Sequence, residues 1–237
     1  MKLRTRVFAQ LAALVLLLGL SAFAQNNAYL YIVHAIPGRD LADNLNPGYP
    51  IDVLLDGKEC EVRNLTFGNT TGPFTLAAGT YSIQISQANS LAPCSNPAVI
   101  SGSITLTGDE NVSAVASINA TQPALVTLSD ELGSVVPGNG RFVFANVADA
   151  PALQATLTQL FGKKPQTFTV SANPGSENWI GIPFGNYSVA ITAVGSSTVL
   201  TSEQIFLQDQ SVTLTYAAGE SLNNTVGLVT RVVRDVF

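Results

Sequence analysis

The sequence is short of the side chains that carry most protein chemistry. Among its 237 residues there are one histidine (His34), two cysteines, one tryptophan and one methionine. The patterns G-x-S-x-G, H-E-x-x-H and C-x-x-C are absent, as is any phosphate-binding glycine loop. We therefore expect a protein that is not an enzyme and that holds no cofactor and no metal ion.

Charge is scarce as well. Only 11% of the residues are charged, whereas an average soluble domain has about 25%. Eleven Lys and Arg face sixteen Asp and Glu, which gives a net charge of −5. Binding to nucleic acid requires clustered basic residues that neutralise phosphates, so we exclude it. The high hydrophobic content of 46% excludes a disordered chain.

The first 24 residues have the pattern of a secretory signal peptide. Three basic residues precede an apolar run from Leu11 to Leu20, and Ala22-Phe23-Ala24 offers a small-residue cleavage site. No later segment is apolar enough to cross a bilayer as a helix. We expect residues 1–24 to be removed and the mature chain to be exported to the periplasm, the cell surface or the medium.

Export favours a disulfide between the two cysteines, Cys60 and Cys94. They lie 34 residues apart in loop-like sequence, and paired cysteines are usual in oxidising compartments. The alternative, a reactive thiol or a metal pair, lacks the usual C-x-x-C spacing and a nearby histidine. The predicted disulfide would add about 3–4 kcal/mol by restricting the unfolded chain.

Strand-forming segments recur along the chain and predict an all-β fold. They are rich in β-branched and aromatic residues and end in turn-forming residues. The clearest are Tyr29–Val33, Tyr81–Ile85, Val112–Val115, Arg141–Phe144, Tyr187–Ile191 and Val212–Tyr216. The best helix candidate, Ala150–Phe161, fits a strand and its loop equally well.

The chain also repeats itself. Gly79–Ile85 matches Gly185–Ile191, and Leu125–Thr127 recurs as Leu228–Thr230. Each copy is about 100 residues long, the size of an immunoglobulin-type sandwich of some seven strands. We predict two tandem immunoglobulin-like β-sandwich domains after the signal peptide. Their predicted bounds are residues 25–132 and 141–237, with a turn-rich linker over residues 133–140.

The repeated Gly-x-Tyr motif predicts a shared structural device. Gly79 and Gly185 would give the backbone the freedom to turn. Tyr81 and Tyr187 would then place their rings on the core and their hydroxyls on a backbone group, as in the tyrosine corner of sandwich domains. We expect these residues to be structural.

Several motifs of the first copy resemble the bacterial domain of unknown function family 4397. They are Val33–Gly38 (V-H-A-I-P-G), Ile51–Lys58 (I-D-V-L-L-D-G-K), Phe67–Gly68 and Phe74–Tyr81 (F-T-L-A-A-G-T-Y). The second copy is similar more loosely, through Asn146–Pro151 and Gly185–Ile191. The resemblance implies an exported immunoglobulin-like domain, often in tandem, with no established activity or catalytic residue. The chain departs from the family pattern by inserting residues 39–50.

His34 and a group of acidic residues have mainly structural interpretations. Asn146 occupies the position of His34 in the second copy, so we expect both to tie down the loop after the first strand. The acidic residues gather in the first copy: Asp40, Asp43, Asp52, Asp56, Glu59 and Glu61. Calcium prefers such oxygen ligands, but the spacing follows no known calcium loop. We expect solvated surface, with a calcium site as the alternative.

Trp179 is the one candidate ligand contact. It follows a turn-like segment, residues 173–178, and we expect its indole to cover the core of the second sandwich, because tryptophan buries a large apolar surface. The alternative is an exposed indole that stacks on a sugar ring.

These observations predict an exported, non-catalytic β-sandwich protein that serves as a binding, adhesion or cell-envelope structural module. The partner is open at this point, with a polysaccharide or another envelope protein as the candidates. The alternative is a small outer-membrane β-barrel. The chain length suits such a barrel, but its strands look shorter than the roughly 9–11 residues that each membrane-spanning strand needs.

Overall fold

The computed structural model describes residues 26–41, 48–162 and 164–234. The predicted signal peptide, residues 1–24, lies outside these ranges. The described residues form sixteen β-strands and one short 3-10 turn, η1 (Gly38–Asp40). The prediction of an all-β chain is confirmed, and the helix candidate over residues 150–161 contains strand β10 (Leu153–Gln159).

The first unit consists of two four-stranded sheets. One has the order β4-β1-β7-β8 and contains β4 (Thr70–Ala77), β1 (Asn27–His34), β7 (Asn111–Asn119) and β8 (Gln122–Ser129). The other has the order β3-β2-β5-β6 and contains β3 (Glu59–Leu65), β2 (Ile51–Leu55), β5 (Gly79–Gln87) and β6 (Ala98–Leu106). β1 pairs in parallel with β7, whereas the other neighbours are antiparallel.

The second unit repeats this topology strand for strand. One sheet has the order β12-β9-β15-β16, formed by β12 (Ser176–Pro183), β9 (Asn139–Asn146), β15 (Val212–Ala218) and β16 (Gly227–Val233). The other has the order β11-β10-β13-β14, formed by β11 (Thr167–Ala172), β10, β13 (Gly185–Ala193) and β14 (Val199–Leu207). The chain therefore holds two immunoglobulin-like β-sandwiches, as predicted, although each has eight strands instead of about seven.

Period-two alternation explains why these segments form half-buried strands. In β13 the side chains of Tyr187, Val189 and Ile191 are fully buried, and the residues between them are less buried. β5 follows the same pattern, with Ile83 and Ile85 buried. Each sandwich encloses its own apolar core between its two sheets.

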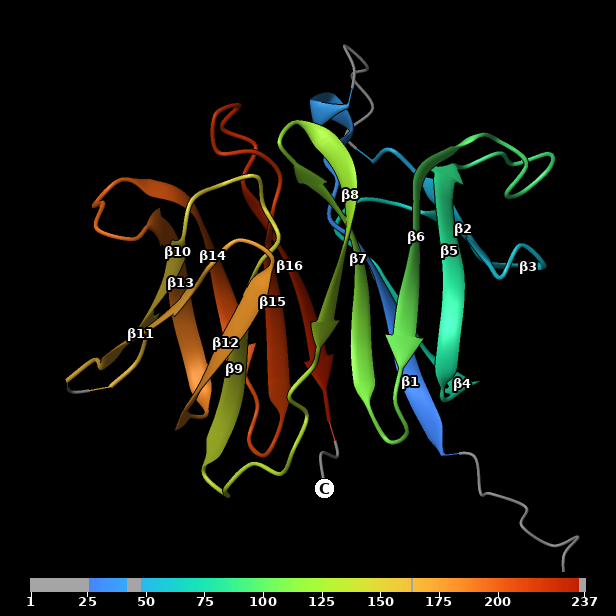
Figure 1. Cartoon of the computed structure of the whole chain (residues 1–237). Helices are drawn as coiled ribbons and strands as arrows, with labels where there is room; N and C mark the ends of the chain where they lie inside the picture. The colour runs from blue at the N-terminus through green and yellow to red at the C-terminus, as the bar shows by residue number, and fades with distance from the viewer. Residues whose placement is uncertain (1–25, 42–47, 163, 235–237) are drawn as a thin grey trace, which may run out of the picture.

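A third apolar cluster lies between the two sandwiches. It joins side chains of β1, β7, β9, β15 and β16, among them Val33, Val115, Val143 and Tyr216. The sheets β4-β1-β7-β8 and β12-β9-β15-β16 therefore face each other, and we call them the inner sheets. The other two are the outer sheets, so the molecule is a stack of four sheets (Figure 1).

The segment between β8 and β9 is fastened to this stack. Leu132 and Val135 pack against the third cluster. The guanidinium of Arg141 donates to the backbone carbonyls of Glu131, Gly133 and Ser134 at 3.1–3.2 Å. β9 begins at Asn139, inside the segment that we predicted to be a linker.

The sheets remain open. Each has two edge strands, so the described strands do not form the single closed sheet that the outer-membrane alternative requires. The described part of the chain also contains no helix with the length and hydropathy needed to cross a bilayer.

Candidate functional site

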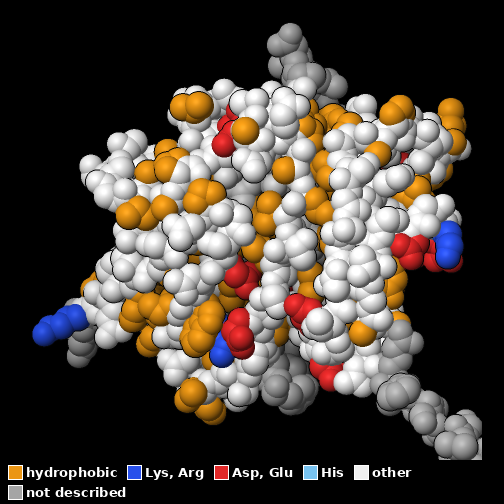
Figure 2. Space-filling model, viewed as in Figure 1, with side chains coloured by type: hydrophobic (Ala, Val, Ile, Leu, Met, Phe, Trp, Pro, Cys, Tyr) orange, Lys and Arg blue, Asp and Glu red, His pale blue; other side chains and the backbone are white. Residues whose placement is uncertain are grey.

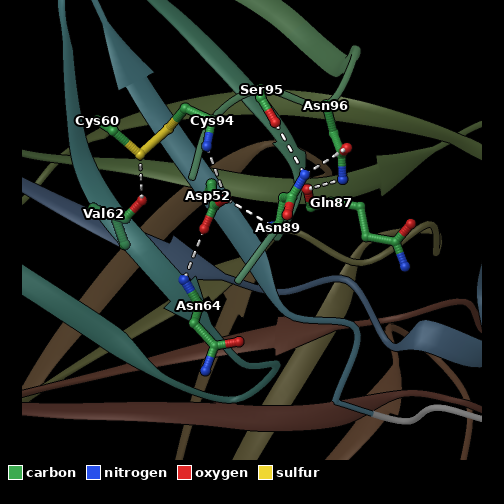
Figure 3. Close-up of a disulfide and its surroundings, with 9 residues drawn as sticks. All are labelled: Asp52, Cys60, Val62, Asn64, Gln87, Asn89, Cys94, Ser95 and Asn96. Atoms are coloured by element: carbon green, nitrogen blue, oxygen red, sulfur yellow. Dashed lines mark hydrogen bonds between the residues drawn. A yellow bond between two sulfur atoms is a disulfide. The ribbon is translucent and has the colours of Figure 1, made fainter. Parts of the chain in front are cut away.

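The disulfide joins β3 to the loop between β5 and β6. Cys60 and Cys94 are bonded, with their Cα atoms 5.8 Å apart, which confirms the predicted pair. The close-up in Figure 3 shows Asp52 of β2 beneath the disulfide. Its carboxylate accepts three backbone N–H groups, from Asn64 at 2.9 Å, Asn89 at 3.0 Å and Cys94 at 2.9 Å. Asp52 therefore fastens β3 and the loop between β5 and β6 to β2.

This arrangement corrects the expectation for Asp52. The residue is only 1% exposed, so it is not part of a solvated acidic surface. Its carboxylate and the two sulfurs lie within 4.8 Å of one another, the one such group of potential ligand atoms among the described residues. The sulfurs are bonded to each other and Asp52 already accepts three hydrogen bonds, so the group acts as a structural clamp. Asp43 lies outside the described residues.

Both ring nitrogens of His34 form hydrogen bonds with the loop that follows β1. Its Nε2 lies 2.6 Å from the carbonyl oxygen of Tyr49, and its Nδ1 accepts the N–H of Ile36 at 3.3 Å. Burial lowers the pKa of His34 to about 4, against an opposing hydrogen bond to Tyr49. The ring is therefore neutral at pH 7 and has no free nitrogen for proton transfer. Asn146 makes the equivalent contact in the second unit, donating to the carbonyl of Pro151 at 2.9 Å.

The tyrosines of the two Gly-x-Tyr motifs make matching hydrogen bonds, but the glycines differ, because the φ of Gly79 lies outside the positive range that Gly185 adopts. The hydroxyl of Tyr81 donates to the carbonyl of Ala77 at 2.8 Å, and that of Tyr187 donates to the carbonyl of Pro183 at 2.7 Å. Both acceptors lie four residues earlier in the chain. Gly185 has a φ of +149°, a backbone conformation that favours glycine.

Trp179 differs from its expected place in the core. It lies on the edge strand β12 and is 48% exposed, because its side chain points away from the interior of the second sandwich. The guanidinium carbon of Arg141 lies 4.5 Å from the centre of its ring. One face of the indole therefore supports Arg141, which holds the linker, and the exposed part is open to solvent.

A buried polar network joins the two units. Arg231 of β16 forms an ion pair with Asp130, which follows β8, at 2.5 Å. Ser113 donates to Asp130 at 2.8 Å and lies 2.9 Å from the hydroxyl of Tyr216. The guanidinium carbon of Arg231 lies 3.5 Å above the ring centre of Tyr31. Burial raises the pKa of Asp130, while Arg231 and Ser113 oppose that rise.

Glu177 lies near this network on β12. Burial and the neighbouring carboxylate of Asp130 raise its pKa to about 8, so the side chain is mostly protonated at pH 7. The sequence analysis missed both Glu177 and the Asp130–Arg231 pair. The available signal was a lone arginine inside the apolar segment of residues 228–233, because such a residue needs a buried partner.

The units also enclose a shallow cleft of about 240 Å³. Its walls come from the end of β7, from β8, from the loop after β9 and from the turn before β12. The N–H of Thr121 donates to Asp149 across the gap at 2.9 Å. The cleft carries one carboxylate, that of Asp149, and mostly small apolar side chains.

Among curated proteins, none is significantly similar in sequence to this chain. Similar solved structures include the Bacillus anthracis TIE protein, at 12% identity and a TM-score of 0.25 over 82% of this chain and 32% of that one. The chain thus spans about a third of the length of that protein. A candidate cell adhesion protein from Bacteroides ovatus is 9% identical, with a TM-score of 0.29 over 88% of this chain and 98% of that one. These values support no inference about function.

The family comparison is more specific. The model of the family described as "Domain of unknown function (DUF4397)" matches residues 28–156, which is more than half of the chain. The single match covers the first unit and continues through β9 into β10. The chain therefore belongs to the DUF4397 family.

Proposed function

We propose that the protein is an exported, non-catalytic binding module of the cell envelope, with both units as copies of the family's domain. The shared strand order supports the two copies. The disulfide supports export, because such bonds persist in oxidising compartments. Structural hydrogen bonds occupy the side chains of His34 and Asp52, so His34 is not available as a base and Asp52 is not available as a metal ligand.

The observation that carries a binding role is a set of uncharged cross-strand pairs on each outer sheet, bordered in the first unit by Asp56, which accepts the N–H of Ser82 at 2.9 Å. On β5 and β6 the exposed cross-strand neighbours are all hydroxyl or amide residues, namely the pairs Thr80–Thr105, Ser82–Ser103 and Gln84–Ser101. In the second unit the matching face carries the pairs Thr156–Thr169, Thr158–Thr167 and Ser188–Gln204, and next to the last pair Asn186 lies opposite the exposed Phe206. The two faces lie at opposite ends of the stack of sheets (Figure 1).

Such faces suit a neutral polysaccharide. Hydroxyl and amide groups donate to and accept from sugar hydroxyls, and the cross-strand pairs themselves carry no charge. Two faces on one rigid body would bind two chains, or two segments of one chain, and so raise the avidity. The exposed part of Trp179 remains a proposed stacking contact outside these faces.

The test is sedimentation of the protein with insoluble neutral polysaccharides such as cellulose and chitin. Ser103→Lys and Gln204→Lys place one charge on equivalent positions of the two faces, and Thr198→Lys adds the same charge to an exposed loop as the control. We expect each face variant to weaken binding about tenfold, roughly 1.4 kcal/mol, and the control to bind normally. Unchanged binding by both face variants would remove the faces from the proposal, and a measured hydrolytic activity would overturn the non-catalytic role.

A further inference from the structure

Three phenylalanines are exposed in the second unit. Phe161 lies in the β10–β11 loop and is 70% exposed, Phe184 lies in the β12–β13 turn and is 49% exposed, and Phe206 lies near the end of β14 and is 52% exposed. Figure 2 shows hydrophobic side chains gathered over the lower part of the second sandwich. Exposed aromatic side chains on several neighbouring turns are unusual for a soluble surface and mark an interaction site.

Backbone pairing places these residues at one end of the sandwich. The N–H of Leu160 donates to the carbonyl of Asn186 at 2.9 Å, and Asn186 is the cross-strand partner of Phe206. The N–H of Phe184 donates to the carbonyl of Gly138, two residues after the exposed Val136. We call the side chains of Val136, Phe161, Phe184 and Phe206 the phenylalanine end.

The first unit shows that the fold does not require these aromatic residues. Thr105 pairs with Thr80 as Phe206 pairs with Asn186. Ala78 precedes Gly79 as Phe184 precedes Gly185. The same topology is therefore built with an alanine and a threonine, so exposing two phenyl rings in the second unit serves something other than folding.

The charge at this end favours a lipid surface. Lys164 lies in the same loop as Phe161, is exposed, and forms no ion pair among the described residues. The acidic residue at this end, Asp209, accepts the N–H of Gly138 at 2.7 Å. Apolar rings beside a free lysine are typical of segments that insert side chains at the headgroup–acyl boundary, where the cation meets lipid phosphate.

A second copy of the chain fits this surface less well. The phenylalanine end consists of four side chains, three in loops or turns and one near the end of β14, whereas a stable protein interface needs about 20–30 residues on each side. We propose that the phenylalanine end docks the protein on a phospholipid surface, with the rings of Phe161, Phe184 and Phe206 inserted and Lys164 at the phosphates. Phe206 borders the outer-sheet face of the second unit, two residues from Gln204 on β14, but vesicle binding is measured without polysaccharide, so the proposal does not depend on polysaccharide binding.

The test is flotation with phosphatidylcholine vesicles and with vesicles that also contain phosphatidylglycerol. The protein is made without residues 1–24, so that the apolar leader cannot itself bind lipid. The main variant, Phe184→Ala with Phe206→Thr, installs the residues of the first unit and so keeps a combination that the fold accommodates. Leu222→Ser removes an apolar side chain that is even more exposed, at 91%, from the opposite end of the second unit and is the control.

We expect the wild type and the Leu222→Ser control to float with both kinds of vesicle. The double variant should bind at least tenfold more weakly, since each inserted ring removes apolar surface from water. Lys164→Gln should reduce only the preference for the anionic vesicles. Failure of the wild type to float, or equal flotation of the double variant, would overturn the proposal. So would a wild type that forms dimers abolished by the double variant while neither protein binds vesicles.

Discussion

The two units share one topology and hold it together by different means. The first is fastened by polar and covalent links: the disulfide, the three hydrogen bonds to Asp52, and His34. The second has none of these and relies on larger core side chains. Phe142 and Phe144 of β9 fill the positions that Leu30 and Ile32 hold in β1. The same fold therefore tolerates either cross-links or aromatic packing as its main support.

The two units also differ in their numbers of charged residues. Residues 25–132 carry ten acidic and three basic residues, whereas residues 141–237 carry six and five. The first unit uses part of this charge in hydrogen bonds to backbone N–H groups, and the second exposes phenyl rings instead. Hydrogen bonds that fix loops are therefore a feature of the first unit, and exposed phenyl rings are a feature of the second.

The largest expected effect comes from separating the units. Arg231→Ala leaves Asp130 buried without its cation, which costs about 3–5 kcal/mol. We expect the wild type to unfold in one transition, and Arg231→Ala to unfold at a lower denaturant concentration in two transitions, one for each unit. Denaturant unfolding followed by fluorescence measures this. Arg234→Ala, an exposed arginine nearby, is the control. An unchanged midpoint in Arg231→Ala would mean that the third apolar cluster alone joins the units.

Next comes the covalent link of the first unit. Replacing both Cys60 and Cys94 by alanine should lower stability by about 3–4 kcal/mol, because the disulfide restricts the unfolded chain. Hydrogen exchange should show the loss in β2, β3 and β5, with the second sandwich protected as before. Equal loss of protection in both units would show that they do not unfold separately even locally.

The third effect is a pH dependence carried by Glu177. Burial raises the pKa of its carboxyl to about 8 in the folded protein, well above the ordinary value of 4.5. The folded state therefore holds the proton more tightly, and this contribution to stability is full below pH 4.5 and is lost as the pH rises through 8. Glu177→Gln should flatten the fall in melting temperature between pH 5 and pH 8. A slope identical to that of the wild type would contradict the assignment.

His34 gives the opposite dependence, in the first unit. Burial lowers its pKa to about 4, well below the ordinary value of 6.5. The contribution of the neutral ring to stability is full above pH 6.5 and is lost as the pH falls through 4, because the unfolded chain then binds a proton that the buried ring does not. His34→Asn, the residue of the second unit, should reduce the loss of melting temperature between pH 6.5 and pH 4. A variant as acid-sensitive as the wild type would sink this explanation.

The smallest expected effect tests the likeness of the two units. Tyr81→Phe and Tyr187→Phe each remove one hydroxyl that donates to a carbonyl four residues earlier. Each should cost about 1 kcal/mol, the usual net value of such a bond plus its unpaired acceptor. Thermal unfolding measures both variants side by side. A cost confined to one variant would show that only one motif acts as a tyrosine corner.

Much of the fold was predictable because it depends on local patterns. All six segments predicted as strands lie within strands, and the repeated Gly-x-Tyr motif occupies matching positions in β5 and β13. The positions of Trp179 and Asp52 were predicted wrongly. Trp179 was expected in a core, but it lies on the edge strand β12 and points away from the core of its sandwich. Alternation gives no information about what covers that face of the strand. Asp52 was expected on a solvated acidic surface, but β3 and the loop between β5 and β6 close over it.

The sequence by itself determined the β-sheet class, the internal repeat and the cysteines that pair, because alternation, turn residues and motif spacing act over short stretches of chain. Only the tertiary structure decided which faces are covered. β7 and β15 are buried on both sides because the inner sheets stack, and Arg231 meets Asp130 across 101 residues. The side chains of the phenylalanine end also come together from three connecting segments and the end of β14. Alternation shows that a strand has two faces, but contact with a neighbouring sheet is what leaves a face buried or exposed.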